Sequence, residues 1–74
     1  MTLYEFNLLD FNHRMEAINQ YGQFIDNHLN NEERCNLYAI DKFFVEVVYN
    51  SEYNTIVEIR SFKTGYLLDK YSNL

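Results

Sequence analysis

Two alternating segments joined by a short polar turn constrain the fold of this chain more than any other feature. Residues 43–50 read FFVEVVYN and residues 55–62 read TIVEIRSF, so apolar and polar side chains alternate in both. Because successive side chains of a β-strand point to opposite faces, a period of two predicts two strands. Between them, Glu52, Tyr53 and Asn54 suit a tight turn in which Asn54 takes the left-handed backbone conformation. The sequence therefore predicts an antiparallel β-hairpin.

The charged residues of the two segments select the register of this hairpin. When Val47 lies opposite Ile59, Glu46 lies opposite Arg60. A shift of two residues sets Glu46 against Glu58, a like-charge pair that costs a few tenths of a kcal/mol or more. A shift of one residue places the aliphatic row opposite the polar row, which is worse. We therefore expect the first register.

The N-terminal segment predicts a helix in one or two pieces. Residues 2–5, TLYE, fit a capping box, and the apolar residues at positions 8, 11, 15 and 18 share one helical face. Asp10 is a candidate second N-cap, which would leave a short first turn and a helix over about 11–21. We favour two pieces, because the Asn and Asp side chains in this stretch compete with a continuous helix. Gly22 is expected to end the helix in the left-handed conformation.

Residues 23–29 and 34–41 predict two further strands, joined by a polar turn. The second of these strands has apolar side chains on both faces, so we expect it to be central. Thr64 can cap a short final helix with Leu67, Leu68 and Tyr71 turned inward. The fold class is α+β: an N-terminal helix, an antiparallel β-meander of three to four strands and a short C-terminal helix, in a single domain over residues 1–74.

The size of the chain favours association with a partner. Seventy-four residues lie near the lower limit for a domain that folds alone, and the lone Cys35 excludes an internal disulfide. Aromatic residues make up 18% of the chain, and each ring can bury about 150–250 Å². Part of this area can be buried between chains, so we expect a homo-oligomer.

Residues with catalytic or metal-binding chemistry are few. Asp26 and His28 share one face of the first predicted strand at the spacing of a partial metal chelate, but no spacing fixes a third ligand. Two polar side chains facing solvent are the favoured interpretation. Cys35 lies in the middle of a strand, as a buried structural thiol does. We expect no catalytic site, no metal and no cofactor, and keep a metal-dependent hydrolase or small-molecule binder around Asp26, His28 and Cys35 as the third hypothesis.

The sequence predicts a cytoplasmic protein without a membrane segment. No apolar run reaches the roughly 20 residues of a membrane span. The N-terminal residues show no basic region followed by an apolar core, so no export signal is expected. A single cysteine fits a reducing compartment.

The distribution of charge suggests a basic partner. Residues 1–33 carry the whole net charge of −5, and the rest of the chain is neutral. Direct binding to nucleic acid needs a basic face, so it is not expected. Solubility alone accounts for such a balance. The alternative hypothesis is an acidic inhibitor of a nucleic-acid-binding protein, such as an immunity protein or an anti-restriction or anti-CRISPR-like DNA mimic. Its acidic patch would consist of Glu5, Glu16, Asp26, Glu32 and Glu33.

The leading hypothesis is a small non-enzymatic protein-protein interaction module that self-associates through the hairpin. Both faces of the hairpin carry apolar side chains, and in the selected register Tyr49 lies opposite Val57. Two short helices can cover only one face, and exposed apolar surface commonly marks an interaction site. The predicted interaction surface consists of Phe44, Val48, Tyr53, Ile56 and Phe62.

Three motifs carry a resemblance that spans most of the chain. They are an E-F-x-x-L opening helix at residues 5–9, a G-x-F first strand at residues 22–24 and an F-x-V-E-V-x-Y-N central strand at residues 43–50. With them the chain resembles short uncharacterised bacterial or mobile-element α+β proteins, which implies such an origin and no activity. The element order is also similar to that of double-stranded-RNA-binding domains. Their Gly-Pro-x-His loop and lysine run are missing here.

Overall fold

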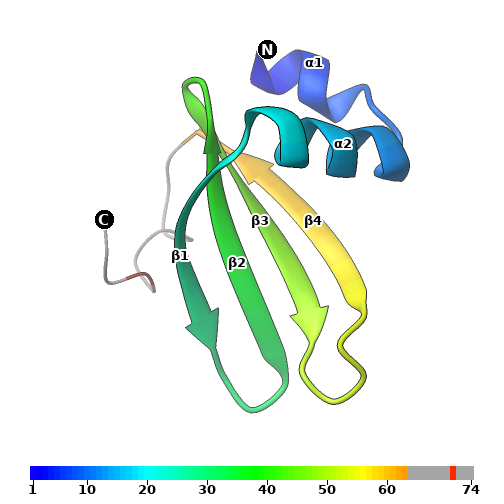
Figure 1. Ribbon diagram of the computed structural model, residues 1–74, viewed down its shortest axis with the longest axis vertical. Coiled ribbons are helices and arrows are strands. Elements are labelled where there is room, and N and C mark those ends of the chain that lie inside the picture. The colour runs from blue at the N-terminus through cyan, green and yellow to red at the C-terminus, as the bar shows by residue number, and fades with distance from the viewer. Residues whose placement is uncertain (64–70, 72–74) are drawn as a thin grey trace.

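Two helices lie across one end of a four-stranded antiparallel sheet (Figure 1). The computed structural model describes residues 1–63 and Tyr71. Within them the elements are α1 (Leu3–Asn7), α2 (Phe11–Tyr21), β1 (Gln23–Leu29), β2 (Glu33–Ile40), β3 (Phe43–Asn50) and β4 (Ile56–Phe62). The strand order β1-β2-β3-β4 makes β1 and β4 the two edges. The predicted α+β meander is confirmed with four strands. The predicted C-terminal helix falls outside the described residues except for Tyr71.

The N-terminal helix is in two pieces because two side chains cap two separate starts. The Thr2 hydroxyl accepts a hydrogen bond from the Glu5 N–H, and the Glu5 carboxylate accepts one from the Thr2 N–H, at 3.1 and 2.8 Å. Asp10 then accepts from the His13 N–H at 2.8 Å and starts α2. In the part of the chain that the structure describes, neither helix has the length and apolar character to cross a membrane.

Gly22 ends α2 in a different way from the one predicted. Its φ of −74° and ψ of 139° are extended, so the expected left-handed conformation is wrong. Its N–H donates to the Ile18 carbonyl oxygen at 2.9 Å, and a Cβ would lie only 2.4 Å from that oxygen. Glycine is therefore required for a close backbone approach where the chain turns into β1.

The β3–β4 hairpin has the predicted register over most of its length. Glu46 pairs with Arg60, and the ladder continues regularly through Val48. The predicted left-handed Asn54 is confirmed by its φ of 56°. Beyond Val48 the register shifts, so Tyr49 pairs with Ile56 and not with Val57 as predicted. A bulge at Val57 is the reason, since two residues of β4 then face one of β3.

The sheet is packed on both faces. A first cluster, between helices and sheet, contains buried Phe6, Ala17, Ile18, Ile40, Phe43, Val45 and Val47. A second cluster, on the opposite face, contains buried Cys35, Leu37, Val48 and Tyr71. The buried structural thiol predicted for Cys35 is confirmed. The second face is therefore covered in part, because Tyr71 packs against it.

Candidate functional site

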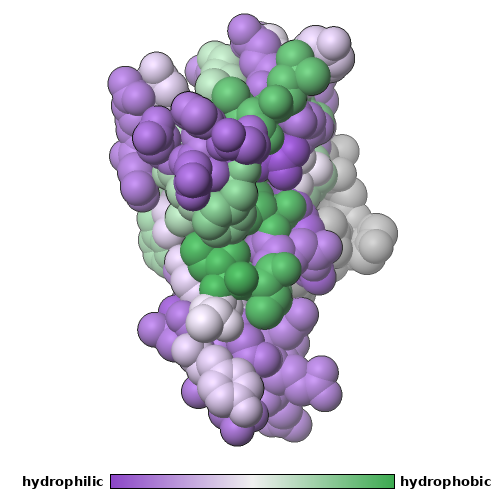
Figure 2. All heavy atoms as spheres, turned by 90° about the vertical axis from the view of Figure 1, so that its right-hand side faces the viewer, coloured by the Kyte–Doolittle hydropathy of each residue, from purple (hydrophilic) through white to green (hydrophobic). Residues whose placement is uncertain are grey.

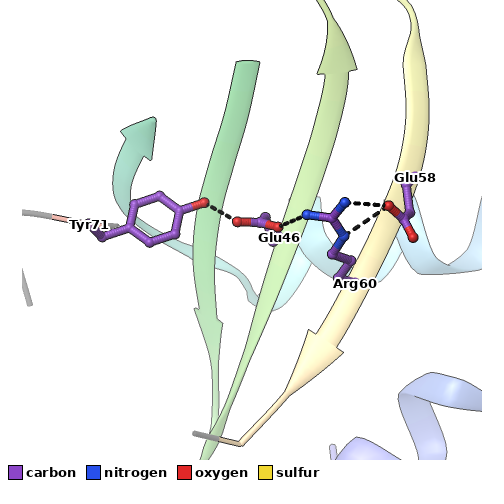
Figure 3. A network of polar contacts seen from close by, with 4 residues as sticks. All are labelled: Glu46, Glu58, Arg60 and Tyr71. Atoms are coloured by element: carbon purple, nitrogen blue, oxygen red, sulfur yellow. Dashed lines mark hydrogen bonds and ion pairs between the residues drawn. The ribbon is translucent and has the colours of Figure 1, made fainter. Parts of the chain in front are cut away.

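A carboxylate buried inside the sheet links three parts of the molecule. Glu46 of β3 is fully buried. It accepts hydrogen bonds from Arg60 Nη1 of β4 at 2.8 Å and from the Tyr71 hydroxyl at 2.5 Å (Figure 3). Arg60 also contacts Glu58 through Nη2 and Nε at 2.7 and 2.8 Å. Because an unpaired buried charge is strongly unfavourable, these contacts are what allows Glu46 to lie inside the fold.

The electrostatics of this network fix the protonation states of Arg60 and Tyr71 at neutral pH. Partial burial alone would lower the pKa of Arg60, but its hydrogen bonds to Glu46 and Glu58 outweigh this effect and raise it. Burial raises the pKa of the Tyr71 hydroxyl, and the hydrogen bond to Glu46 raises it further. Neither group exchanges a proton near neutral pH, as a general acid or base does. The network is therefore a structural link between strands.

Three residues of the predicted interaction surface belong to the second face. Val48 is fully buried in the second cluster, together with Tyr71. Phe44 and Phe62 are half-buried and stack on each other, with ring centroids 6.1 Å apart. Val48 cannot contact a partner in this arrangement, because its side chain lies beneath other parts of the same chain.

The other two residues of the predicted surface lie elsewhere. Ile56 pairs with Tyr49 and packs against the cluster under the helices, so it is on the opposite face from Phe44. The bulge at Val57 is responsible, because it reverses the side of the sheet that Ile56 faces. Tyr53 is 70% exposed at the hairpin turn. The structure therefore does not bring the five residues together as one exposed face.

The residues of the predicted acidic patch are dispersed. Glu5 belongs to α1, and Glu32 to the β1–β2 turn at the opposite end of the molecule (Figure 1). Glu16 is exposed on α2, whereas Glu33 is half-buried at the start of β2. Asp26 is buried. A mimic of nucleic-acid charge needs a continuous row of exposed carboxylates, which this arrangement does not supply.

Asp26, His28 and Cys35 meet on the second face of the sheet without forming a metal site. His28 pairs with Cys35 across β1 and β2, and its ring lies 6.2 Å from that of Tyr71. Asp26 is buried and accepts a hydrogen bond from the Asn27 N–H at 2.8 Å, so the expectation that it faces solvent is wrong. Among the described residues, no three His, Cys, Asp or Glu side chains are placed to hold a metal ion.

A surface cavity of about 510 Å³ lies where the N-terminus meets the β2–β3 turn. Its wall includes Thr2, Asp41 and Lys42. The Thr2 hydroxyl is engaged in the capping box, and Asp41 accepts a hydrogen bond from the N-terminal ammonium at 2.5 Å. Among the described residues that line this cavity, none is a nucleophile hydrogen-bonded to a base.

The side of the molecule formed by β4 and the α1–α2 turn exposes apolar side chains that the sequence pattern did not identify. Val57 is 56% exposed, and Leu8 and Phe11 on either side of the turn are 69% and 52% exposed. The turn lies against β4, where Ser61 Oγ donates to Asn7 Oδ1 at 2.5 Å. Figure 2 shows hydrophobic side chains gathered at the middle of this side and extending toward the helices. We call Leu8, Phe11 and Val57 the β4-side surface.

This surface borders an edge strand. In the described part of the chain, β4 pairs with β3 on one side and with no strand on the other. The side chains of its two charged residues, Glu58 and Arg60, are on one face of the sheet. Ile59, between them in the sequence, is on the other face. Backbone groups along such an edge can pair with a strand from another chain.

Comparison with known proteins found no match: no protein-family model, curated protein or solved structure matches the chain. The resemblance to short bacterial or mobile-element proteins stays a prediction. The functional proposal therefore rests on the residues of the chain itself.

Proposed function

We propose that this chain is a small, non-catalytic protein-protein interaction module that contacts its partner through the β4-side surface and the adjoining edge of β4. The observation that carries the proposal is the position of Leu8, Phe11 and Val57. All three are more than half exposed; Val57 belongs to the edge strand β4, and Leu8 and Phe11 flank the turn after α1, which contacts β4. Apolar side chains gathered in this way gain free energy when a partner removes them from water.

The composition of β4 supports strand addition as the mode of contact. Edge strands that avoid other chains commonly carry proline or lysine. Residues 56–62 read IVEIRSF and contain neither. In strand addition the main chain supplies most of the hydrogen bonds, and the neighbouring side chains supply specificity. On this surface, Leu8, Phe11 and Val57 would provide that specificity.

The non-catalytic part of the proposal is supported by the state of the candidate chemical groups. Cys35 is buried in the second cluster, where neither water nor a substrate reaches its thiol. Asp26 is buried as well and bonded to its own backbone neighbour. A nucleophile or a general base must reach its substrate to act.

Matched lysine substitutions on the two edges of the sheet test the proposal. The tagged full-length chain is crosslinked in cells, and every protein joined to it, its own copies included, is quantified. Leu8→Lys and Val57→Lys should each lower the crosslinked partner at least tenfold, because each places a charge in an apolar contact. Phe24→Lys and Leu29→Lys, on exposed residues of β1, should leave it unchanged. The proposal would be contradicted if all four variants gave the same amount of crosslinked partner, or if the wild type gave none.

A further inference from the structure

We propose that the partner that covers the β4-side surface is a second copy of this chain, joined by antiparallel pairing of the two β4 strands about a two-fold axis at Ile59. The inference rests on the proposed interaction function and names its partner. The two sheets would then form one continuous sheet of twice the width. Closed two-fold pairing of this kind is the commonest form of self-association.

Two-fold symmetry leaves few registers for such a pairing. In an antiparallel pair related by a two-fold axis, one residue must lie opposite its own copy on the axis. With Ile59 on the axis, Glu58 of each chain lies opposite Arg60 of the other. Both side chains are on the same face of the sheet in this chain, as the pairing requires. The symmetric dimer therefore has two new pairs of opposite charges.

The neighbouring registers are unfavourable. An axis at Glu58 sets two carboxylates directly opposite each other, and an axis at Arg60 does the same with two guanidinium groups. Like charges directly opposite on adjacent strands are destabilising. Since Glu58 and Arg60 are the only charged residues of β4, the charge pattern of the strand selects Ile59 as the axis.

Glu58 is free enough of its own chain to take part in this contact. Its side chain is 51% exposed, although it already accepts from Arg60. Arg60 keeps its bond to the buried Glu46 through Nη1. In the dimer, two copies of Glu58 and two of Arg60 would form one group without net charge. Such a group sets no like charges opposite each other, so it adds nothing to the repulsion between two chains of net charge −5.

The same register also covers the β4-side surface. With Ile59 on the axis, Val57 lies opposite Ser61 of the second copy. Ser61 is hydrogen-bonded to Asn7, whose chain neighbour is the exposed Leu8. Val57 of one copy is therefore brought toward the α1–α2 turn of the other, where Leu8 is exposed, and the symmetry makes this approach twice. The bulge at Val57 ends the regular pairing at that point.

The test measures the mass of the purified full-length chain by sedimentation equilibrium over a range of concentrations. The wild type should show a concentration-dependent equilibrium between monomer and dimer. Glu58→Lys sets a lysine opposite Arg60 of the second copy, so the dimer dissociation constant should rise at least tenfold. Glu58→Gln removes the charge pair without adding repulsion, so it should raise the dimer dissociation constant less. Circular dichroism and thermal unfolding should show that both variants keep the fold.

Glu52→Lys is the matched control, because it makes the same charge change at the exposed hairpin turn, away from the strand. It should leave the dimer as stable as the wild type.

A wild type that stays monomeric at millimolar concentration would overturn the inference. If the wild type is monomeric but Val57→Lys loses a different crosslinked protein, the proposed function still holds. If no crosslinked protein is found either, the proposed function is contradicted as well. A dimer weakened equally by Glu58→Lys and Glu52→Lys would show that the contact lies outside β4. If Glu58→Lys fails to fold, an unchanged dimer in Glu58→Gln would overturn the proposed register.

Discussion

The two edges of the sheet have the same topology but different chemistry. In β1, a register shift between Phe24 and Asp26 interrupts the pairing with β2 after the first two residues of the strand. Asp26 accepts a hydrogen bond from the Asn27 N–H of the same edge strand, and the ring of Phe24 packs edge-on against Tyr38. In β4 the irregularity lies at the start of the strand, and the residues after it are regularly paired. Both edges therefore carry a bulge near the start of the strand, and the difference is that in β1 a side chain bonds the edge backbone, which discourages pairing with another chain.

Charge pattern alone does not distinguish the two edges. A two-fold axis at Asn27 of β1 would set Asp26 opposite His28 of a second copy, as an axis at Ile59 sets Glu58 opposite Arg60. Asp26 is buried, however, whereas Glu58 is half-exposed. A complementary charge pattern therefore favours association only where the charged side chains are accessible to a second chain.

The largest expected effect concerns the link between the β4 edge and the interior. Arg60→Ala leaves the carboxylate of Glu46 buried without its guanidinium partner, so the free energy of unfolding should fall by about 3–5 kcal/mol. Urea denaturation at low protein concentration, where the monomer is measured, checks this. Glu58→Ala removes only a half-exposed partner and should cost about 0.2–1 kcal/mol. Equal losses in the two variants would mean that Arg60 does not hold Glu46.

A smaller effect is expected from the Tyr71 side of the same carboxylate. Tyr71→Phe removes one donor to Glu46 and should lower the free energy of unfolding by about 1–3 kcal/mol. Tyr21→Phe, which removes a hydroxyl from an exposed residue of α2, is the matched control and should have no measurable effect.

The pKa of Tyr71 adds a pH dependence to this comparison. Because its pKa is raised in the folded chain, the unfolded chain loses the hydroxyl proton first when the pH rises above about 10. The stability that Tyr71 contributes is therefore complete below that pH and declines above it. Denaturation curves between neutral and alkaline pH should show a smaller decline for Tyr71→Phe than for the wild type. If the free energy of unfolding declined equally with pH in the two proteins, the assignment of this pH dependence to Tyr71 would be contradicted.

The parts of the fold that depend on local side chains could be predicted from the sequence. Thr2 and Asp10 cap helices because of their own side chains, and Asn54 adopts the left-handed conformation for a similar reason. The pairing of Glu46 with Arg60 follows from opposite charges.

The parts that depend on distant packing could not be predicted. The bulge at Val57 is a backbone irregularity with no required residue type, yet it decides which face Ile56 occupies. The period of two places Glu46 and Val48 on one face but does not reveal that Tyr71 packs there. Leu8 and Phe11 would share the inward face of one continuous helix. The break at Asp10 exposes them instead.

Disulfide crosslinking of single cysteines tests most directly whether β4 is the open edge. In a Cys35→Ala background, Ile59→Cys places a thiol on the proposed axis, where the paired Cα atoms of an antiparallel sheet lie within disulfide range. Under mild oxidation this variant should form a covalent dimer. Val57→Cys, more exposed but off the axis, and Asn27→Cys, at the equivalent position of β1, should remain monomeric. Crosslinking of Asn27→Cys as rapid as that of Ile59→Cys, or an Ile59→Cys variant that stays monomeric, would contradict the account.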